Sequence, residues 1–152
     1  MVKIKYAEDK LFDIAFPLLK RVHRIPSKHK VEWHKHLRGY EVDVYITWRS
    51  SGWPSFKSMV VELKENDIVK ALDQALKRRS LALFTYVVIN LKPAYLFRLL
   101  IQYHMDILQE AVNKGIGLIS VSGENPVLLL RSEINTNWII DSYFKEIQND
   151  KK

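Results

Sequence analysis

One run of residues limits the fold of this chain more than any other. Residues 83–89, Leu-Phe-Thr-Tyr-Val-Val-Ile, are nearly all apolar and are rich in β-branched and aromatic types. Such a strand is typical of a sheet that is covered on both faces. Helical patterns precede it over residues 68–80 and follow it over residues 93–113. A chain of 152 residues is long enough for one packed core and too short for two. We therefore expect a single α/β domain with a central mixed β-sheet flanked by helices.

Hydrophobic spacing and breaker residues predict the other elements. An amphipathic helix should run from Ile4 to about His23, and Pro17 should bend or interrupt it. Asp67 should cap the helix of residues 68–80, and Gly115 should follow the end of the helix of residues 93–113. Strands are expected at 41–46, 59–64, 116–122 and 126–131, with a short extended piece at 30–34 and a final helix from Asn135 or Thr136 to about residue 148. The strands of residues 41–46 and 59–64 should pair as an antiparallel hairpin.

The positive charge of the chain is concentrated in two places. Lys and Arg number 24 against 17 Asp and Glu, which gives a formal charge of +7. Residues 20–38 contain seven Lys and Arg residues and a single acid, Glu32, and they form one basic cluster. Residues 77–79 form a second. A basic surface attracts polyanions, of which nucleic acid is the commonest, although the charge could also serve solubility alone. The residues expected to contact a nucleic-acid backbone are Arg24, Lys28, Lys30, Lys35, Arg38, Lys77, Arg78 and Arg79.

Several classes of protein are excluded or disfavoured by the sequence. The chain has no cysteine, which excludes disulfides, thiol catalysis and cysteine-based metal sites. No apolar run approaches the roughly 20 residues of a membrane span, and the charged start has no signal-peptide core. We therefore expect an intracellular, cytoplasmic protein that does not bind membranes. No glycine-rich phosphate loop and no zinc-protease spacing is present.

The two strands of the predicted hairpin carry the residues that indicate chemistry. Side chains alternate along a strand, so Glu62 and Lys64 should share one face while Leu63 points to the core. If the two strands are neighbours, Asp43 can converge on the same place. Two adjacent carboxylates repel each other, and a divalent cation such as Mg²⁺ relieves that repulsion with one or two carboxylates, a carbonyl and several waters. The same alternation is also what any half-exposed strand shows, so the pattern alone leaves both interpretations open.

The order of these residues along the chain resembles a known family. An acid lies at the start of the first helix (Glu8), another in the first hairpin strand (Asp43), and Glu-x-Lys in the second (Glu62, Lys64). A helix carrying Gln74 and a buried strand follow. This order resembles the PD-(D/E)XK nuclease superfamily, over residues 8–89 and more weakly through residues 115–118. Within it the chain is similar to small archaeal and viral nucleases, including Holliday junction resolvases. The resemblance implies a restriction-endonuclease-like fold for the whole of residues 1–152.

The resemblance also implies a role for each of these residues. Asp43 and Glu62 would be the two metal-binding acids, and the backbone carbonyl of Leu63 a further ligand. Lys64 would activate water or stabilise the transition state, and Glu8 would reach the metal through water. The expected cofactor is Mg²⁺, for which Mn²⁺ should substitute. Val42 stands where the name of the motif has proline.

The sequence therefore predicts a magnesium-dependent deoxyribonuclease that recognises the form of its DNA, such as ends, flaps or junctions, more than its base order. The alternatives are a non-catalytic DNA-binding module on the same fold and a protein-interaction subunit. A homodimer is expected, because cutting both strands requires two sites related by symmetry. His34 and His36 are expected to contact phosphate or solvent rather than a metal. Aromatic residues of the hairpin loop (Trp48, Trp53, Phe56) could stack on an unpaired base or cover the end of the sheet.

Overall fold

The computed structural model describes the backbone of residues 7–150 and the side chains of residues 8–145, and it contains one six-stranded mixed sheet. The strands lie in chain order: β1 (His29–Leu37), β2 (Tyr40–Arg49), β3 (Phe56–Lys64), β4 (Phe84–Ile89), β5 (Gly117–Ser122) and β6 (Asn125–Leu130). Neighbours β1, β2 and β3 are antiparallel, β3, β4 and β5 are parallel, and β6 is antiparallel to β5. The expected single α/β domain with a mixed sheet is confirmed.

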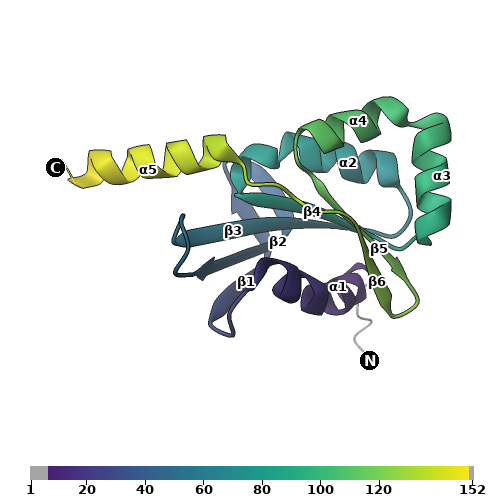
Figure 1. The fold of residues 1–152 in the computed structure, drawn as a ribbon, viewed down its shortest axis with the longest axis horizontal. Helices are drawn as coiled ribbons and strands as arrows, with labels where there is room; N and C mark the ends of the chain where they lie inside the picture. Colours follow the sequence, from purple (N-terminus) through teal and green to yellow (C-terminus); the bar gives the residue numbers. More distant parts are fainter. Residues whose placement is uncertain (1–6, 151–152) are drawn as a thin grey trace.

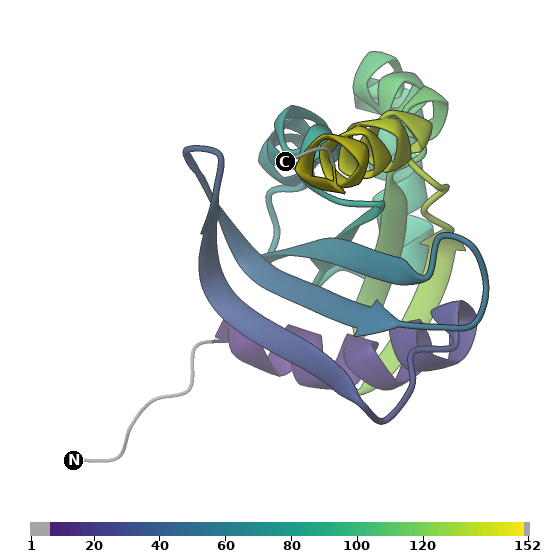
Figure 2. The same ribbon diagram turned by 90° about the vertical axis from the view of Figure 1, so that its left-hand side faces the viewer.

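Helices cover both faces of this sheet. One face is crossed by α1 (Ala7–His23), and the other is covered by α2 (Ile68–Lys77), α3 (Pro93–Tyr103) and α4 (Met105–Asn113), as Figures 1 and 2 show. The last helix, α5 (Thr136–Asp150), extends away from the end of the sheet (Figure 1). No helix within residues 7–150 is long and apolar enough to cross a membrane.

Strand β4 lies between the two halves of the core. All six of its residues are buried. Tyr86 and Val88 pack into the cluster beneath α1, whereas Val87 and Ile89 pack into the cluster beneath α2, α3 and α4. The continuous apolar run is thus explained, because both faces of the strand are removed from water.

Several features differ from the sequence-based expectation. Strand β1 is nine residues long rather than a short extended piece, because it pairs with β2 over almost its full length. The helix expected over residues 93–113 is broken at His104, whose backbone leaves the helical region. Pro17 lies inside α1 without interrupting it, on an exposed position of the helix. The start of the expected first helix, residues 4–6, lies outside the described residues. The two caps were predicted correctly: Asp67 accepts a hydrogen bond from the Lys70 N–H at 3.1 Å, and Asn135 accepts one from the Trp138 N–H at 3.3 Å.

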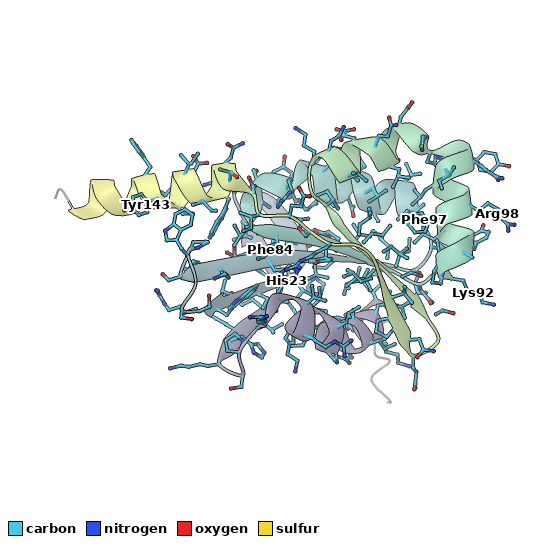
Figure 3. All side chains as sticks on the ribbon, in the orientation of Figure 1. His23, Phe84, Lys92, Phe97, Arg98 and Tyr143 are labelled. Atoms are coloured by element: carbon cyan, nitrogen blue, oxygen red, sulfur yellow. The ribbon has the colours of Figure 1, made fainter. Side chains whose placement is uncertain are left out.

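A half-buried histidine lies at the C-terminal end of α1 and connects that helix to β4. His23 packs against Phe84, with 4.3 Å between ring centroids (Figure 3), and its Nε2 is hydrogen-bonded to the Tyr86 hydroxyl. That hydroxyl also accepts a bond from the Ser132 N–H at 3.1 Å, so its own proton is available for His23. Burial, with a further contribution from the charge of Arg131, lowers the pKa of His23 from 6.5 to about 4.

We expect this histidine to make the fold sensitive to mild acid. As the pH falls through 6.5, the unfolded chain binds a proton at His23 that the folded chain does not bind until about pH 4. One pKa unit corresponds to about 1.4 kcal/mol, so the free energy of unfolding should fall by roughly 2–3 kcal/mol over this interval. Urea unfolding at pH 7 and pH 4.5 measures the loss. His23→Gln should lose less than the wild type between these pH values, whereas His36→Gln, at an exposed site, should behave like the wild type. Equal losses in all three proteins would contradict the prediction.

Candidate active site

Asp43 lies where β2 and β3 separate. The two strands pair from Arg49–Phe56 to Val44–Val61, and the next positions along each strand are Asp43 and Glu62. Beyond this point the Leu63 N–H donates to a side chain of β2 rather than to its main chain. The acceptor is Asp43 Oδ2, at 2.8 Å. In a strand the N–H and C=O of one residue point to the same side, so the Leu63 carbonyl also faces the Asp43 side. A carboxylate and a carbonyl are thereby brought to one place.

Glu62 is a buried carboxyl group beside Asp43. It is only 2% exposed, and its Oε1 has no hydrogen-bond donor in the described structure. The closest cation contact is Arg78, whose Nε lies 3.5 Å from that oxygen. Burial first, and then the negative charge of Asp43, raise the pKa of Glu62 to about 8 in spite of Arg78 and Lys64. The fold holds this acid in a place that disfavours its charge, which is how functional carboxyl groups are commonly found.

Glu8, at the start of α1, is electrostatically coupled to the same site. Burial, followed by the charge of Asp43, raises the pKa of Glu8, and the charge of Lys64 lowers it. The structure therefore places Glu8, Asp43, Glu62 and Lys64 within one electrostatic neighbourhood, although they come from α1, β2 and β3.

Sequence reasoning missed one further acid of this neighbourhood. Glu65 also raises the pKa of Glu8, and its Oε1 is buried without a hydrogen-bond donor. Its other oxygen accepts a bond from Asn90 Nδ2 at 2.8 Å. Strand alternation places Glu65 on the face opposite Lys64, which is why the pattern did not single it out. The signal that could have found it is its position directly after the last residue of β3, where the strand ends and alternation no longer holds.

The residues present fit a divalent cation. Mg²⁺ binds through one or two carboxylates with hard oxygen donors and water, and Asp43, Glu62 and the Leu63 carbonyl offer that set. Glu62 Oε1, which has no hydrogen-bond donor and only the 3.5 Å contact with Arg78, is the oxygen that a cation would satisfy. Among the described residues, no group of three or more Asp, Glu or His side chains is placed so that it could hold a metal ion. A cation held here would therefore keep water among its ligands.

The expected basic residues differ in their exposure and in their contacts. Arg24, Lys28, Lys30 and Arg38 are exposed around β1. Lys30 and Lys35 both contact Glu32, at 3.4 and 2.8 Å, and Lys77 contacts Asp73 at 3.0 Å. Arg78 bonds the Glu41 carbonyl at 3.2 Å and lies over the Tyr40 ring, beside Glu62.

Arg79 corrects the expectation that residues 77–79 all contact nucleic acid. It is 8% exposed, and its guanidinium donates to the carbonyls of Lys114, Leu83 and Glu133. Burial lowers its pKa to about 10. Arg79 is a structural residue in this fold, because its donors are used by main-chain carbonyls.

Three other candidates have less distinct places. Gln74 is half-buried on α2, and its backbone carbonyl accepts a bond from Arg78 Nη1 at 3.2 Å. His34 and His36 are exposed on β1, and His36 lies 3.8 Å from Glu41.

Comparison with known proteins gives little beyond the fold. No model of a known protein family matches the chain, and no curated protein matches it. Among solved structures, the chain is similar to "SPO1766 protein of unknown function from Silicibacter pomeroyi", with a TM-score of 0.51 and 11% identity. The similarity covers 97% of this chain and 90% of that protein. It is a similarity of fold, and it extends over nearly the whole of both chains.

Proposed function

We propose that this protein is a metal-dependent deoxyribonuclease that hydrolyses phosphodiester bonds. The observation that carries the proposal is the pair Asp43 and Glu62, which adjoin each other beside the Leu63 carbonyl, with one Glu62 oxygen buried and without a hydrogen-bond donor. A buried acid whose charge is disfavoured beside a second carboxylate gains a counter-charge if a cation binds between the two.

The residues of the site have separate tasks in this proposal. Bound Mg²⁺, or Mn²⁺ in its place, would polarise the phosphate and lower the pKa of an attached water. Asp43, Glu62 and the Leu63 carbonyl hold and orient that cation. Lys64 orients the attacking water or offsets the charge that develops on the phosphate. Glu8 accepts a hydrogen bond from a water on the α1 side of the site.

The arrangement of elements supports a restriction-endonuclease-like fold as part of the proposal. The order α1, β1, β2, β3, α2, β4 gives an antiparallel three-stranded unit followed by a parallel strand reached through a helix. The proposed acids Asp43 and Glu62 lie near the start of β2 and near the end of β3, and therefore at the same end of this unit. The exposed cations around β1 would follow the DNA backbone, which favours recognition of DNA form, and two copies of the chain would be needed to cut both strands.

The first test is cleavage of labelled DNAs with Mg²⁺, Mn²⁺ or EDTA. The substrates are a single strand, a blunt duplex, a flap, a four-way junction and a supercoiled plasmid. We expect cutting that requires the metal and that falls by at least about 100-fold in Lys64→Ala, because a group that stabilises transition-state charge has an effect of this size. Lys92→Ala is the matched control, since Lys92 is an exposed residue that precedes α3 (Figure 3). Cutting at the wild-type rate by Lys64→Ala from a preparation free of other nucleases would refute the proposed role.

One observation favours the alternative of a non-catalytic DNA-binding module. The Arg78 guanidinium lies 3.5 Å from Glu62 and occupies part of the place where a cation would act. A binding module predicts retarded DNA without cleavage in any divalent metal, and binding that is insensitive to Asp43→Ala. The same set of DNAs, run on a native gel, separates the two functions.

A further inference from the structure

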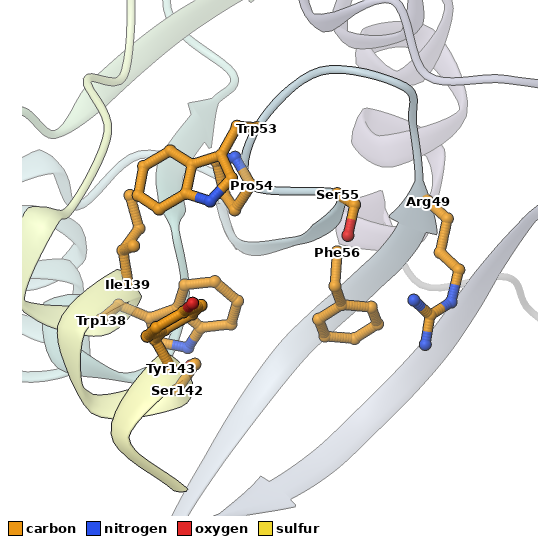
Figure 4. A pocket seen from close by; sticks show the side chains of 9 residues that line it. All are labelled: Arg49, Trp53, Pro54, Ser55, Phe56, Trp138, Ile139, Ser142 and Tyr143. Atoms are coloured by element: carbon orange, nitrogen blue, oxygen red, sulfur yellow. The ribbon is translucent and has the colours of Figure 1, made fainter. Parts of the chain in front are cut away.

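A second candidate site lies at the opposite end of β2 and β3 from the acids. The loop between these strands and the first turns of α5 enclose a cavity of about 530 Å³. Figure 4 shows Trp53 and Pro54 on one side of it and residues of α5 on another, with Phe56 and Arg49 along the strands. From Phe56 to Glu62 is six residues of one strand, or about 20 Å at the usual rise per residue. The cavity is therefore separate from the acids.

The cavity presents flat aromatic faces. Phe56 and Trp138 are stacked, with 6.3 Å between ring centroids and 24° between ring planes. Trp53 is 73% exposed and Tyr143 is 54% exposed, although both line a cavity and could be covered by a ligand. The loop that carries Trp53 is held in place by Lys57, whose Nζ donates to the Pro54 carbonyl at 2.8 Å and to the Ser50 hydroxyl. These hydrogen bonds fix the backbone of the loop and hence the position from which Trp53 projects.

Cations continue from this cavity onto the neighbouring surface. Arg49 lies over the Phe56 ring, with its Cζ 5.5 Å from the ring centroid. Arg49 and Phe56 also line a second hollow, which Lys28, Lys30 and His29 border on the side of β1. Among the described residues, no carboxylate lines either hollow. The aromatic cavity and the basic hollow therefore share a wall and form one surface.

We propose that this surface binds a single-stranded polynucleotide. An unstacked base lies among Trp53, Trp138 and Tyr143, and the adjoining phosphates lie along Arg49, Lys28 and Lys30. Stacking platforms beside a basic groove are how single strands are bound without sequence preference, since every base has an aromatic face. Bases inside a duplex are already stacked and paired, so the surface selects unpaired strands. Binding here does not require the acids or a metal.

The test is fluorescence anisotropy in EDTA, where no cleavage can occur. The probes are a labelled 12-nucleotide oligothymidylate and an abasic strand of the same length. Trp53→Ala should weaken binding of the oligothymidylate by about tenfold and leave binding of the abasic strand unchanged, because only the first offers bases to stack. Trp53→Phe should keep most of the affinity. Arg49→Gln should weaken binding of both strands and reduce the salt dependence by the equivalent of about one phosphate contact.

The controls match these variants in exposure. Tyr103 on α3 is 73% exposed, like Trp53, and Arg98 points into solvent from the same helix (Figure 3). Tyr103→Ala and Arg98→Gln should bind both probes as the wild type does. Equal affinity of Trp53→Ala and the wild type for oligothymidylate would overturn the proposal. So would a change in oligomeric state of Trp53→Ala in sedimentation, which would make the surface a contact between copies of this chain. Neither outcome affects the nuclease proposal, which depends on cleavage in Mg²⁺.

Discussion

Glu62→Gln is expected to abolish metal-dependent cleavage and at the same time to stabilise the folded protein at high pH. The folded pKa of Glu62, about 8, lies above its ordinary value of 4.5. A group with a raised folded pKa contributes stability that is fully present below pH 4.5 and is lost as the pH rises through 8. Glutamine resembles the neutral acid and avoids that loss. Since one pKa unit corresponds to about 1.4 kcal/mol, the difference between 4.5 and about 8 corresponds to a gain at pH 9 of up to about 5 kcal/mol.

Urea unfolding at pH 5 and pH 9 measures this effect. The stability difference between Glu62→Gln and the wild type should be small at pH 5 and large at pH 9. Mg²⁺ should raise the midpoint of thermal unfolding of the wild type and have little effect on the variant, since binding to the folded state alone stabilises it. Glu124→Gln, in the exposed turn between β5 and β6, is the matched control and should change neither quantity. A lower stability of Glu62→Gln at pH 9 would mean that the contact with Arg78 outweighs the cost of burial, and that Glu62 is a structural residue.

The fold was predictable where its signals are local. The β4 run and the Asp67 cap each depend on a few neighbouring residues, and both are predicted by the sequence. The half-exposed alternation expected for β3 is wrong, because the strand is buried on both faces over residues 58–63. The length of β1 was not predictable, because most of its side chains are exposed or half-buried and its residues become a strand through pairing with β2. The break at His104 could not be predicted either, because no glycine or proline lies near it in the sequence. It lets Leu96 and Leu100 of α3 and Leu108 of α4 all enter the core beneath the sheet's second face, which is a tertiary requirement.

The candidate site shows the same division. Glu62, Lys64 and Asp43 could be placed together from alternation and strand pairing alone. The burial of Glu62 could not, since it depends on the packing of α2 against β3 and on Arg78, the residue that follows α2. Arg78 and Arg79 look alike in sequence, yet one faces the acid site and the other is directed into the fold. Basic residues at a helix end can bind a nucleic acid, pair with an acidic side chain or donate hydrogen bonds to main-chain carbonyls. The tertiary packing determines which of these partners each residue has.

Arg79→Lys is expected to cost the fold about 2–4 kcal/mol, although the charge is kept. The Arg79 guanidinium bonds the Lys114 carbonyl at 2.8 Å, the Leu83 carbonyl at 3.2 Å and the Glu133 carbonyl, which belong to three separate chain segments. The single ammonium group of lysine lacks the planar fork that reaches all three, and a hydrogen bond from a charged group is worth about 1.5–3 kcal/mol.

Urea unfolding at pH 7 measures the cost, with Arg98→Lys on the exposed face of α3 as the control that should change little. At temperatures where the variant is folded, its affinity for DNA should equal that of the wild type, because Arg79 is buried and its guanidinium donates to main-chain carbonyls. A variant with unchanged stability and weakened DNA binding would reverse this assignment and return Arg79 to the nucleic-acid surface. The two measurements together therefore decide whether Arg79 serves the fold or the DNA, and they do so without reference to the metal site.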